Sequence, residues 1–412
     1  MSNFMFVVPP YYGHITATLG IGSELISRGH KVCWVSLREI DKGFIPEGAQ
    51  WLVPDEVKAR QNDIDRILDR QNIGTVLNDE ETLDFILYES LFPFAEILNS
   101  GIQGVIDSFK PDAIIQDESA LSGAVAAVRN NIPYATSITV PPGFFEKDLF
   151  NPVSQKKMLD KVRIAQKGMG IESERIIFNS DKLVLSFTSA DLLRPRYRDF
   201  EFDAPIAFVG AAILGRPEPN QFDWGRVKNR DLPIIYISIG TLLDDTREII
   251  FKLMVDAFAN RPFTIIANTD PSLLDRWPGN FIVQKMFPQL EILSKVDLVI
   301  THAGFNTLNE ALYFDLPLIA LPLAWDQGVN AELVTHHGCG LKFDYRTLAP
   351  SELLDAATEV LGQPEYRKNA ASLGESLRRG GGTKRAADLI EQLANHTDAI
   401  PASHREFHPE AP

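Results

Sequence analysis

The side chains that could do chemistry are densest just after an apolar run at residues 297–301, where His302, Asn306, Thr307 and Glu310 follow one another. A strand that turns through small residues into a helix points free backbone N–H groups and the positive end of the helix dipole at one spot, which suits a phosphate. Glu310 lies one helical turn after Asn306 on the same face, where a carboxylate can accept from the hydroxyls of a ribose. The stretch therefore predicts a nucleotide site.

The elements that must position these groups are the strand, a tight turn at residues 303–304 and a helix at 305–314. A further apolar run at 317–322 predicts the neighbouring strand, and Asp326 and Gln327 follow its end. Open parallel sheets bind ligands at the carboxyl edge of their strands. We therefore expect this acid and amide to lie beside the nucleotide site.

A second histidine stands at the start of the chain. His14 follows a predicted strand at residues 4–8, in what we expect to be a loop before the first helix, and Asp117 ends a predicted strand at 113–117. Both would lie at one carboxyl edge, where the carboxylate can orient the imidazole and stabilise its protonated form. Taken alone, a histidine in this place is more often structural than catalytic.

The downstream motifs resemble the donor-binding signature of the family 1 glycosyltransferases, most closely the bacterial macrolide, carotenoid and natural-product branch. The residues that carry the resemblance are Pro288 and Gln289, the run from His302 to Thr307, Glu310 to Leu312, Pro317, Pro322, Asp326 and Gln327, Asn330 and Ala331, and Gly338 to Gly340. They keep their order and spacing over about sixty residues, which is far more specific than a lone glycine motif.

The resemblance implies a role for each matched position. His14 would be the general base and Asp117 its partner. Donor binding would fall to Ser238, Thr241, Gln289, His302, Gly304, Asn306, Thr307, Glu310, Asp326 and Gln327. Within that set, Glu310 matches the ribose carboxylate, and the acid and amide at 326–327 match the pair that contacts the sugar hydroxyls, which favours a hexose such as glucose. From the residues alone, Ser238 and Thr241 are equally well explained as helix caps.

One position departs from the family pattern. Many relatives carry a tryptophan two residues before the Pro-Gln pair, where it stacks on uracil, whereas this chain has Met286 and Phe287 there. Either Met286 makes a sulfur contact to the base, or Phe287 shifts to cover it. The choice among UDP, dTDP and GDP stays open at this position.

The resemblance also implies an α/β protein with the GT-B fold, in which two Rossmann-like, doubly wound parallel sheets face a central cleft. The alternation of strands and helices in both halves agrees with this fold class. We expect an acceptor-binding domain over residues 1–213, a linker over 214–230 that is rich in Pro, Gly and charge, and a nucleotide-sugar domain over 231–382. Residues 383–412 would form a closing helix on the first domain and a frayed tail.

Composition and charge limit the kinds of partner, metal and cellular location that we expect for this protein. The 412 residues carry a net charge of −15 without a basic block, which argues against a nucleic-acid binder. There is no basic leader or bilayer-length apolar run, and the two cysteines have no metal or disulfide spacing, so we expect a cytoplasmic protein. No Asp, Glu or His cluster has metal-ligand spacing, which predicts a metal-independent reaction. Whether the chain is a monomer or a homodimer stays open.

The function that these features favour is an inverting O-glycosyltransferase that moves a hexose, glucose from UDP-glucose in the first instance, to a hydroxyl of a hydrophobic natural product. Aromatic residues of the first half are candidate acceptor contacts, namely Tyr12, Phe85, Tyr88 and Phe144. The alternative is a catalytically silent partner that binds a nucleotide sugar or metabolite. A sugar-nucleotide epimerase or lipid-linked transferase is disfavoured by His14 and the 326–327 pair, and a dehydrogenase by the missing G-x-G-x-x-G.

Overall fold

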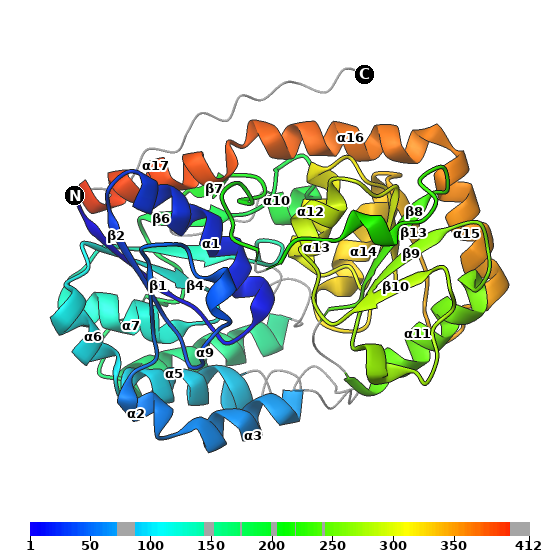
Figure 1. Cartoon of the computed structure of the whole chain (residues 1–412). Coiled ribbons are helices and arrows are strands. Elements are labelled where there is room, and N and C mark those ends of the chain that lie inside the picture. The colour runs from blue at the N-terminus through cyan, green and yellow to red at the C-terminus, as the bar shows by residue number, and fades with distance from the viewer. Residues whose placement is uncertain are drawn as a thin grey trace.

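Two parallel β-sheets, each covered by helices on both faces, form the two lobes of the molecule (Figure 1). The computed structural model describes residues 1–71, 87–143, 152–173, 175–198, 204–218, 220–240 and 244–395.

The first sheet consists of short strands, and all except the edge strands β3 and β7 are almost completely buried. Its members are β1 (Asn3–Val7), β2 (Lys31–Val35), β3 (Gln50–Leu52), β4 (Ala113–Asp117), β5 (Tyr134–Ile138), β6 (Leu183–Ser186) and β7 (Ile206–Phe208). Runs such as Phe-Met-Phe-Val in β1 are apolar without alternation because both faces of a parallel sheet are covered.

The helices of the first half divide between the two faces of this sheet. They are α1 (Tyr12–Ser27), α2 (Asp55–Lys58), α3 (Gln61–Gln71), α5 (Phe92–Asn99), α6 (Ile102–Phe109), α7 (Leu121–Asn130), α9 (Pro152–Gly168) and α10 (Pro195–Arg198), with a π-helical turn at Leu87–Leu91 directly before α5. Helix α1 packs on one face, and α5, α6 and α7 share a core on the other.

The second sheet repeats the same design. Its strands are β8 (Ile234–Ser238), β9 (Thr264–Asn268), β10 (Phe281–Gln284), β11 (Leu298–Thr301), β12 (Leu318–Ala320) and β13 (Gly340–Lys342). Its helices are α11 (Asp244–Phe258), α12 (Gln289–Leu293), α13 (Phe305–Tyr313), α14 (Gln327–His336), α15 (Pro350–Gly362) and α16 (Pro364–Arg379). Helices α11 and α15 cover one face, and α12, α13, α14 and α16 contribute to the core on the other.

The last helix, α17 (Gly382–Asn395), returns to the first lobe, where it packs beside α1 (Figure 1). The backbone at Gly210 lies very close to the backbone of α16, since a Cβ on Gly210 would lie 1.9 Å from the Leu377 carbonyl oxygen. The φ of Gly210 is also positive, at +71°. The Gly382 N–H donates to the Val209 carbonyl over 2.6 Å. Glycine at position 210 therefore permits a backbone approach that a side chain would prevent.

Both sheets have a Rossmann-type strand order. The first runs β3-β2-β1-β4-β5-β6-β7 and the second β10-β9-β8-β11-β12-β13, and the pairings within both are parallel. The direction of winding reverses between β1 and β4 and between β8 and β11, which is where such folds bind ligands. The predicted doubly wound α/β class is confirmed.

Candidate active site

His14 lies at the reversal point of the first sheet. It sits in the first turn of α1, not in a preceding loop as predicted, because the helix begins at Tyr12. Its Nδ1 lies 2.9 Å from Asp117 Oδ1, at the end of β4, and 2.9 Å from Thr139 Oγ1, just after β5. Asp117 is fully buried, and its Oδ1 also accepts from the Ser119 N–H at 2.9 Å. The structure therefore brings the predicted pair together and adds Thr139, which the sequence analysis did not identify.

Two carboxylates, Asp117 and Asp326, raise the pKa of His14. Burial alone would lower the pKa of the imidazole, but the charge and hydrogen bond of Asp117, helped by the charge of Asp326, raise it above its ordinary value of 6.5. Burial in turn raises the pKa of Asp326 to about 6, opposed by its hydrogen bond from Asn330 and by His14. Asp326 belongs to the second lobe, so the two lobes interact electrostatically at this histidine.

The raised pKa of His14 predicts an acid limb in the rate profile. A general base accepts a proton only when it is neutral, so kcat/KM should fall as the pH drops through a midpoint above 6.5. Replacing Asp117 with asparagine removes the largest contributions that raise this pKa, and the limb should move to lower pH. An Asp326→Asn variant, which removes a smaller contribution, should move it less. A limb that stays in place in Asp117→Asn would contradict this assignment.

The predicted anion-binding turn lies at the reversal point of the second sheet, between β11 and α13. The imidazole of His302 is enclosed by two glycines, since a Cβ on Gly240 or on Gly304 would approach its Nε2 to 2.8 or 2.7 Å. Its Nδ1 lies 3.4 Å from the Ser238 carbonyl oxygen. Burial lowers the pKa of His302 to about 4, so the ring is neutral at pH 7. Together with the N-terminus of α13, this turn presents hydrogen-bond donors to an anion.

The enclosure of His302 makes Gly304 a sensitive position. A Gly304→Ala variant should force the His302 ring out of place, lower stability by about 1–3 kcal/mol through overpacking, and weaken nucleotide binding. Titration calorimetry with UDP and thermal unfolding measure the two effects. Gly104→Ala in α6 is the matched control, because a Cβ there meets nothing within 4 Å. Equal UDP affinity in the two variants would show that the His302 position is not required.

Two residues at this edge have strained backbones. Ala303, between His302 and the helix, has a φ of +63°, and Trp325, directly before Asp326, has a φ of +57°. Non-glycine residues rarely adopt such values, and those that do are concentrated at functional sites. Trp325 is also one of the few exposed large apolar side chains, at 38%. Its exposure beside Asp326 makes it a site residue that the sequence analysis passed over.

Asn306 reaches across to the first lobe. Its Nδ2 donates to the Gly13 carbonyl oxygen over 2.5 Å, which brings the first turn of α13 against the residue directly before His14. Thr307 follows in the same turn and is half-buried. The contact brings the anion-binding turn of the second lobe close to the predicted base in the first lobe.

Glu310 has partners that the sequence analysis did not foresee. Arg216 donates from Nη1 to Oε1 over 2.5 Å and from Nη2 to Oε2 over 3.4 Å, while Gln289 Nε2 donates to Oε2 over 2.7 Å. Gln289 Oε1 also lies 3.5 Å from the Ser238 hydroxyl. Ser238, Gln289 and Glu310 are thus brought together as predicted. No sequence signal pointed to Arg216, because it lies in a segment that was identified only as a polar linker.

Asp326 and Gln327 are held by local hydrogen bonds at the start of α14. Gln327 Oε1 accepts from the backbone N–H groups of Leu323 and Ala324 at 2.8 and 3.1 Å. These two contacts use the amide oxygen and leave the –NH₂ group to donate to other partners. Asn330 is fully buried and donates both to Asp326 Oδ2 at 2.6 Å and to the Ala303 carbonyl at 2.9 Å. Asn330 therefore links the acid to the anion-binding turn and does more than cap a helix.

The two alternatives for the base contact differ in their surroundings. Phe287 is 5% exposed and packs in the core against Phe222 with ring centres 5.5 Å apart, so it does not face a ligand. Met286 is only partly buried and packs against the core of the first lobe, as Tyr12 also does. Of the two side chains, Met286 is the one available to a nucleobase.

Of the four predicted acceptor contacts, Tyr12 and Tyr88 lie within the described residues. Tyr12 packs on Phe44. Burial, helped by the charge of Glu310 and opposed by that of Arg216, raises the pKa of Tyr12, so this side chain interacts electrostatically with the donor cluster. Tyr88 is 50% exposed and stacks edge-on against Phe92. Tyr11 approaches His14, with ring centres 5.5 Å apart. Phe85, Phe144 and the predicted donor residue Thr241 lie outside the described residues.

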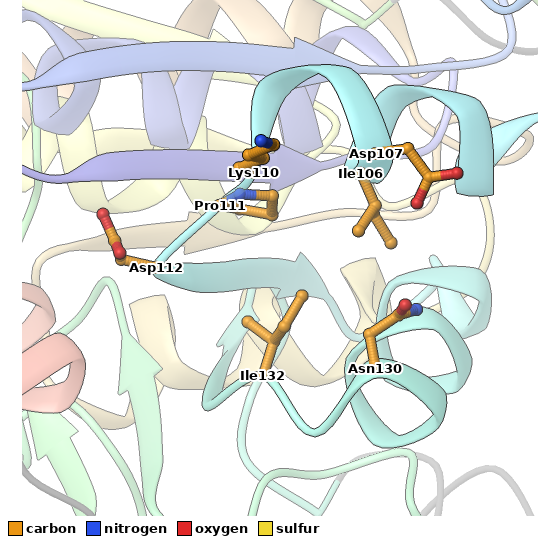
Figure 2. Close-up of a pocket in the computed structure, with 7 residues that line it drawn as sticks. All are labelled: Ile106, Asp107, Lys110, Pro111, Asp112, Asn130 and Ile132. Carbon is orange, nitrogen blue, oxygen red and sulfur yellow. The ribbon is translucent and has the colours of Figure 1, made fainter.

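A surface pocket lies away from this edge. Figure 2 shows a surface pocket lined by Ile106, Asp107, Lys110, Pro111, Asp112, Asn130 and Ile132. It lies where β4 begins, whereas Asp117 marks where β4 ends. Ligands of doubly wound sheets bind at the carboxyl edge, so this pocket is not the predicted site.

Two kinds of feature are absent from the described residues. Within the part of the chain that the structure describes, no helix is both long and apolar enough to cross a membrane. The same residues contain no group of three or more His, Cys, Asp or Glu side chains arranged to hold a metal ion.

Comparison with known proteins shows the family and the fold of this chain. The family model described as "UDP-glucoronosyl and UDP-glucosyl transferase" matches residues 62–379. The NDP-glycosyltransferase YjiC of Bacillus subtilis is 25% identical, over 95% of this chain and 97% of its own. A zeaxanthin glucosyltransferase of Pseudescherichia vulneris is 24% identical, over 97% and 100%. The crystal structure of the calicheamicin glycosyltransferase CalG4 superimposes with a TM-score of 0.75 at 18% identity, over 96% and 99% of the two chains, which shows the shared GT-B fold.

Proposed function

Because this chain belongs to the UDP-glucoronosyl and UDP-glucosyl transferase family, whose members move a sugar from a nucleotide to a small-molecule acceptor, we propose that it is an inverting O-glycosyltransferase. The proposed donor is UDP-glucose, and the proposed acceptor is a hydroxyl of a hydrophobic natural product such as a polyketide, macrolide, carotenoid or phenol. The names of two relatives, an NDP-glycosyltransferase and a zeaxanthin glucosyltransferase, support this choice.

One observation carries the proposal. His14 is hydrogen-bonded through Nδ1 to the buried Asp117, and the anion-binding turn contacts the residue before it through the Asn306–Gly13 hydrogen bond. The proposed base and the proposed phosphate site therefore lie close together, one on each lobe. Transfer of a glycosyl group from a nucleotide diphosphate to an alcohol requires this pairing of groups.

The proposed reaction begins at the second nitrogen of His14. The hydrogen bonds recorded for this side chain within the described residues use Nδ1, so Nε2 is available to accept the proton of the acceptor hydroxyl. The acceptor oxygen then attacks the anomeric carbon while the bond from that carbon to the diphosphate oxygen breaks. Asp117 stabilises the imidazolium that forms, as the carboxylate does in other His–Asp pairs. Attack opposite the leaving group converts an α-linked donor into a β-glycoside.

The departing nucleotide diphosphate gains negative charge as this bond breaks. The backbone N–H groups at the start of α13, its helix dipole and the His302 ring lie at the turn that would receive this charge. We propose that these groups suffice without a metal ion, so EDTA should leave turnover unchanged. Asp326 and the free end of the Gln327 amide would accept from and donate to the sugar hydroxyls, which favours glucose over a deoxysugar.

The test is a transfer assay. The purified protein is incubated with UDP-glucose, dTDP-glucose or GDP-glucose and a panel of apolar alcohols and phenols, and products are detected by mass spectrometry. A new glucoside with a β configuration by NMR is the expected result. Binding of UDP without transfer to any acceptor would instead favour the silent-partner alternative.

A further inference from the structure

The carboxylate of Glu310 is already engaged before any ribose arrives. Three N–H donors reach it, two from Arg216 and one from Gln289, at 2.5, 3.4 and 2.7 Å. The side chains of Arg216 and Glu310 are each only 6% exposed. Neither Arg216 nor Gln289 belongs to α13, the helix that carries Glu310. Arg216 lies in the linker, and Gln289 is the first residue of α12.

Arg216 is built into its position and is not a surface side chain that happens to fold inward. Its guanidinium lies between two carboxylates, Glu310 and Glu218, the second 3.9 Å from Nη2. Glu218 also accepts from the backbone N–H groups of Leu290 and Glu291 at the start of α12, at 2.9 and 3.2 Å. Displacing Arg216 would leave the buried Glu310 and the half-buried Glu218 without a cation, which is strongly unfavourable. We therefore expect Arg216 to stay on Glu310 when a nucleotide binds.

The number of acceptor positions left on Glu310 follows from its lone pairs. A carboxylate offers about four acceptor positions, two on each oxygen. Gln289 and Arg216 Nη2 occupy those of Oε2, and Arg216 Nη1 occupies one on Oε1. A single position remains on Oε1. Glu310 can thus accept from one ribose hydroxyl, although a ribose presents two.

We propose, on the basis of the function proposed above, that Arg216 and Gln289 determine the nucleoside specificity of the donor site. By leaving Glu310 one free acceptor position, they make it bind a single sugar hydroxyl, and whichever hydroxyl is present takes that position. The site then binds 2′-deoxyribonucleoside diphosphates nearly as well as ribonucleoside diphosphates. Arg216 also offsets the charge of Glu310, which a diphosphate would otherwise meet in a chain of net charge −15.

UDP and dUDP test this inference, because they differ only in the 2′-hydroxyl. Isothermal titration calorimetry with the full chain should give dissociation constants within about threefold of each other. A second hydroxyl bound to the charged carboxylate would instead favour UDP by more than about tenfold. That larger ratio in the wild-type protein would overturn the inference and leave the proposed function intact.

Two variants test the assignment to particular residues. Gln289→Ala opens a position on Oε2, so the second hydroxyl can bind and the preference for UDP over dUDP should rise above about tenfold. Arg216→Lys keeps the charge but loses the two-pronged contact, and it should shift the ratio in the same direction. It therefore provides the test if Gln289→Ala does not fold. Gln103→Ala, on the surface of α6, is the matched control and should keep the wild-type ratio.

The outcomes separate the two proposals. A ratio that stays near one in both variants shows that neither residue limits the carboxylate, and the inference is wrong. If neither nucleotide binds at millimolar concentration and no sugar is transferred, the donor site itself is wrong, and the inference falls with it.

Discussion

Replacement of His14 with alanine should lower kcat by about 10²- to 10⁴-fold, the usual contribution of a positioned general base, while the dissociation constant for UDP stays at the wild-type value. The reason is geometric. His14 is held from the first lobe by Asp117 and Thr139, whereas the predicted nucleotide contacts belong to the second lobe. Initial rates with saturating donor, together with calorimetry, measure the two quantities.

Two further variants keep this experiment interpretable. His14→Ala leaves the buried Asp117 without its histidine, so a loss of folding must be separated from a loss of chemistry. His14→Gln retains a donor for Asp117 but cannot act as the base, and it should be folded and equally slow. His336→Ala, at an exposed position, should behave as wild type. Retention of most of the activity in His14→Gln would show that another group takes the proton.

The second large effect concerns stability. Arg216→Met should lower the free energy of unfolding by about 3–5 kcal/mol, since it removes one partner of a buried ion pair and leaves uncompensated charge. Burial would lower the pKa of the guanidinium, but Glu310, and to a lesser extent Glu218, hold it above its ordinary value, so the group is charged in the folded protein. Urea unfolding followed by tryptophan fluorescence measures the loss.

A double variant identifies the cause of that loss. Adding Glu310→Gln to Arg216→Met removes the carboxylate that lost its partner and should recover part of the stability, while Glu218 keeps the recovery incomplete. Arg346→Met breaks an exposed ion pair with Asp344 and should unfold like the wild-type protein. If Arg216→Met matches this control, the ion pair between Arg216 and Glu310 contributes nothing to folding.

Much of the site could be predicted because parallel strands deliver their ends to one edge. β4 was predicted with its observed bounds, so the meeting of Asp117 with a histidine after β1 followed from topology. In the same way, the turn after β11 has to lie at the carboxyl edge of the second sheet. Local sequence is sufficient for such statements because strand direction and order determine where side chains at strand ends lie.

Predictions within irregular segments had no such support. Phe287 and Met286 are neighbours in a segment without regular structure, and no periodicity indicates which one turns into the core. Tyr12 was predicted as an acceptor contact because it is aromatic, and nothing in its local sequence indicated its electrostatic interaction with Arg216 and Glu310. Side-chain direction at such positions depends on what packs against them from elsewhere in the chain.

The sequence by itself determined the fold class, the family, and the two strand edges at which the base and the anion-binding turn lie, because apolar periodicity and motif spacing are local properties. Only the tertiary structure decided how the two edges meet, through the Asn306–Gly13 contact, and that Arg216 occupies Glu310. Both contacts join residues far apart in the chain. Their partners are chosen by how the lobes and the linker pack together, which no short stretch of sequence specifies.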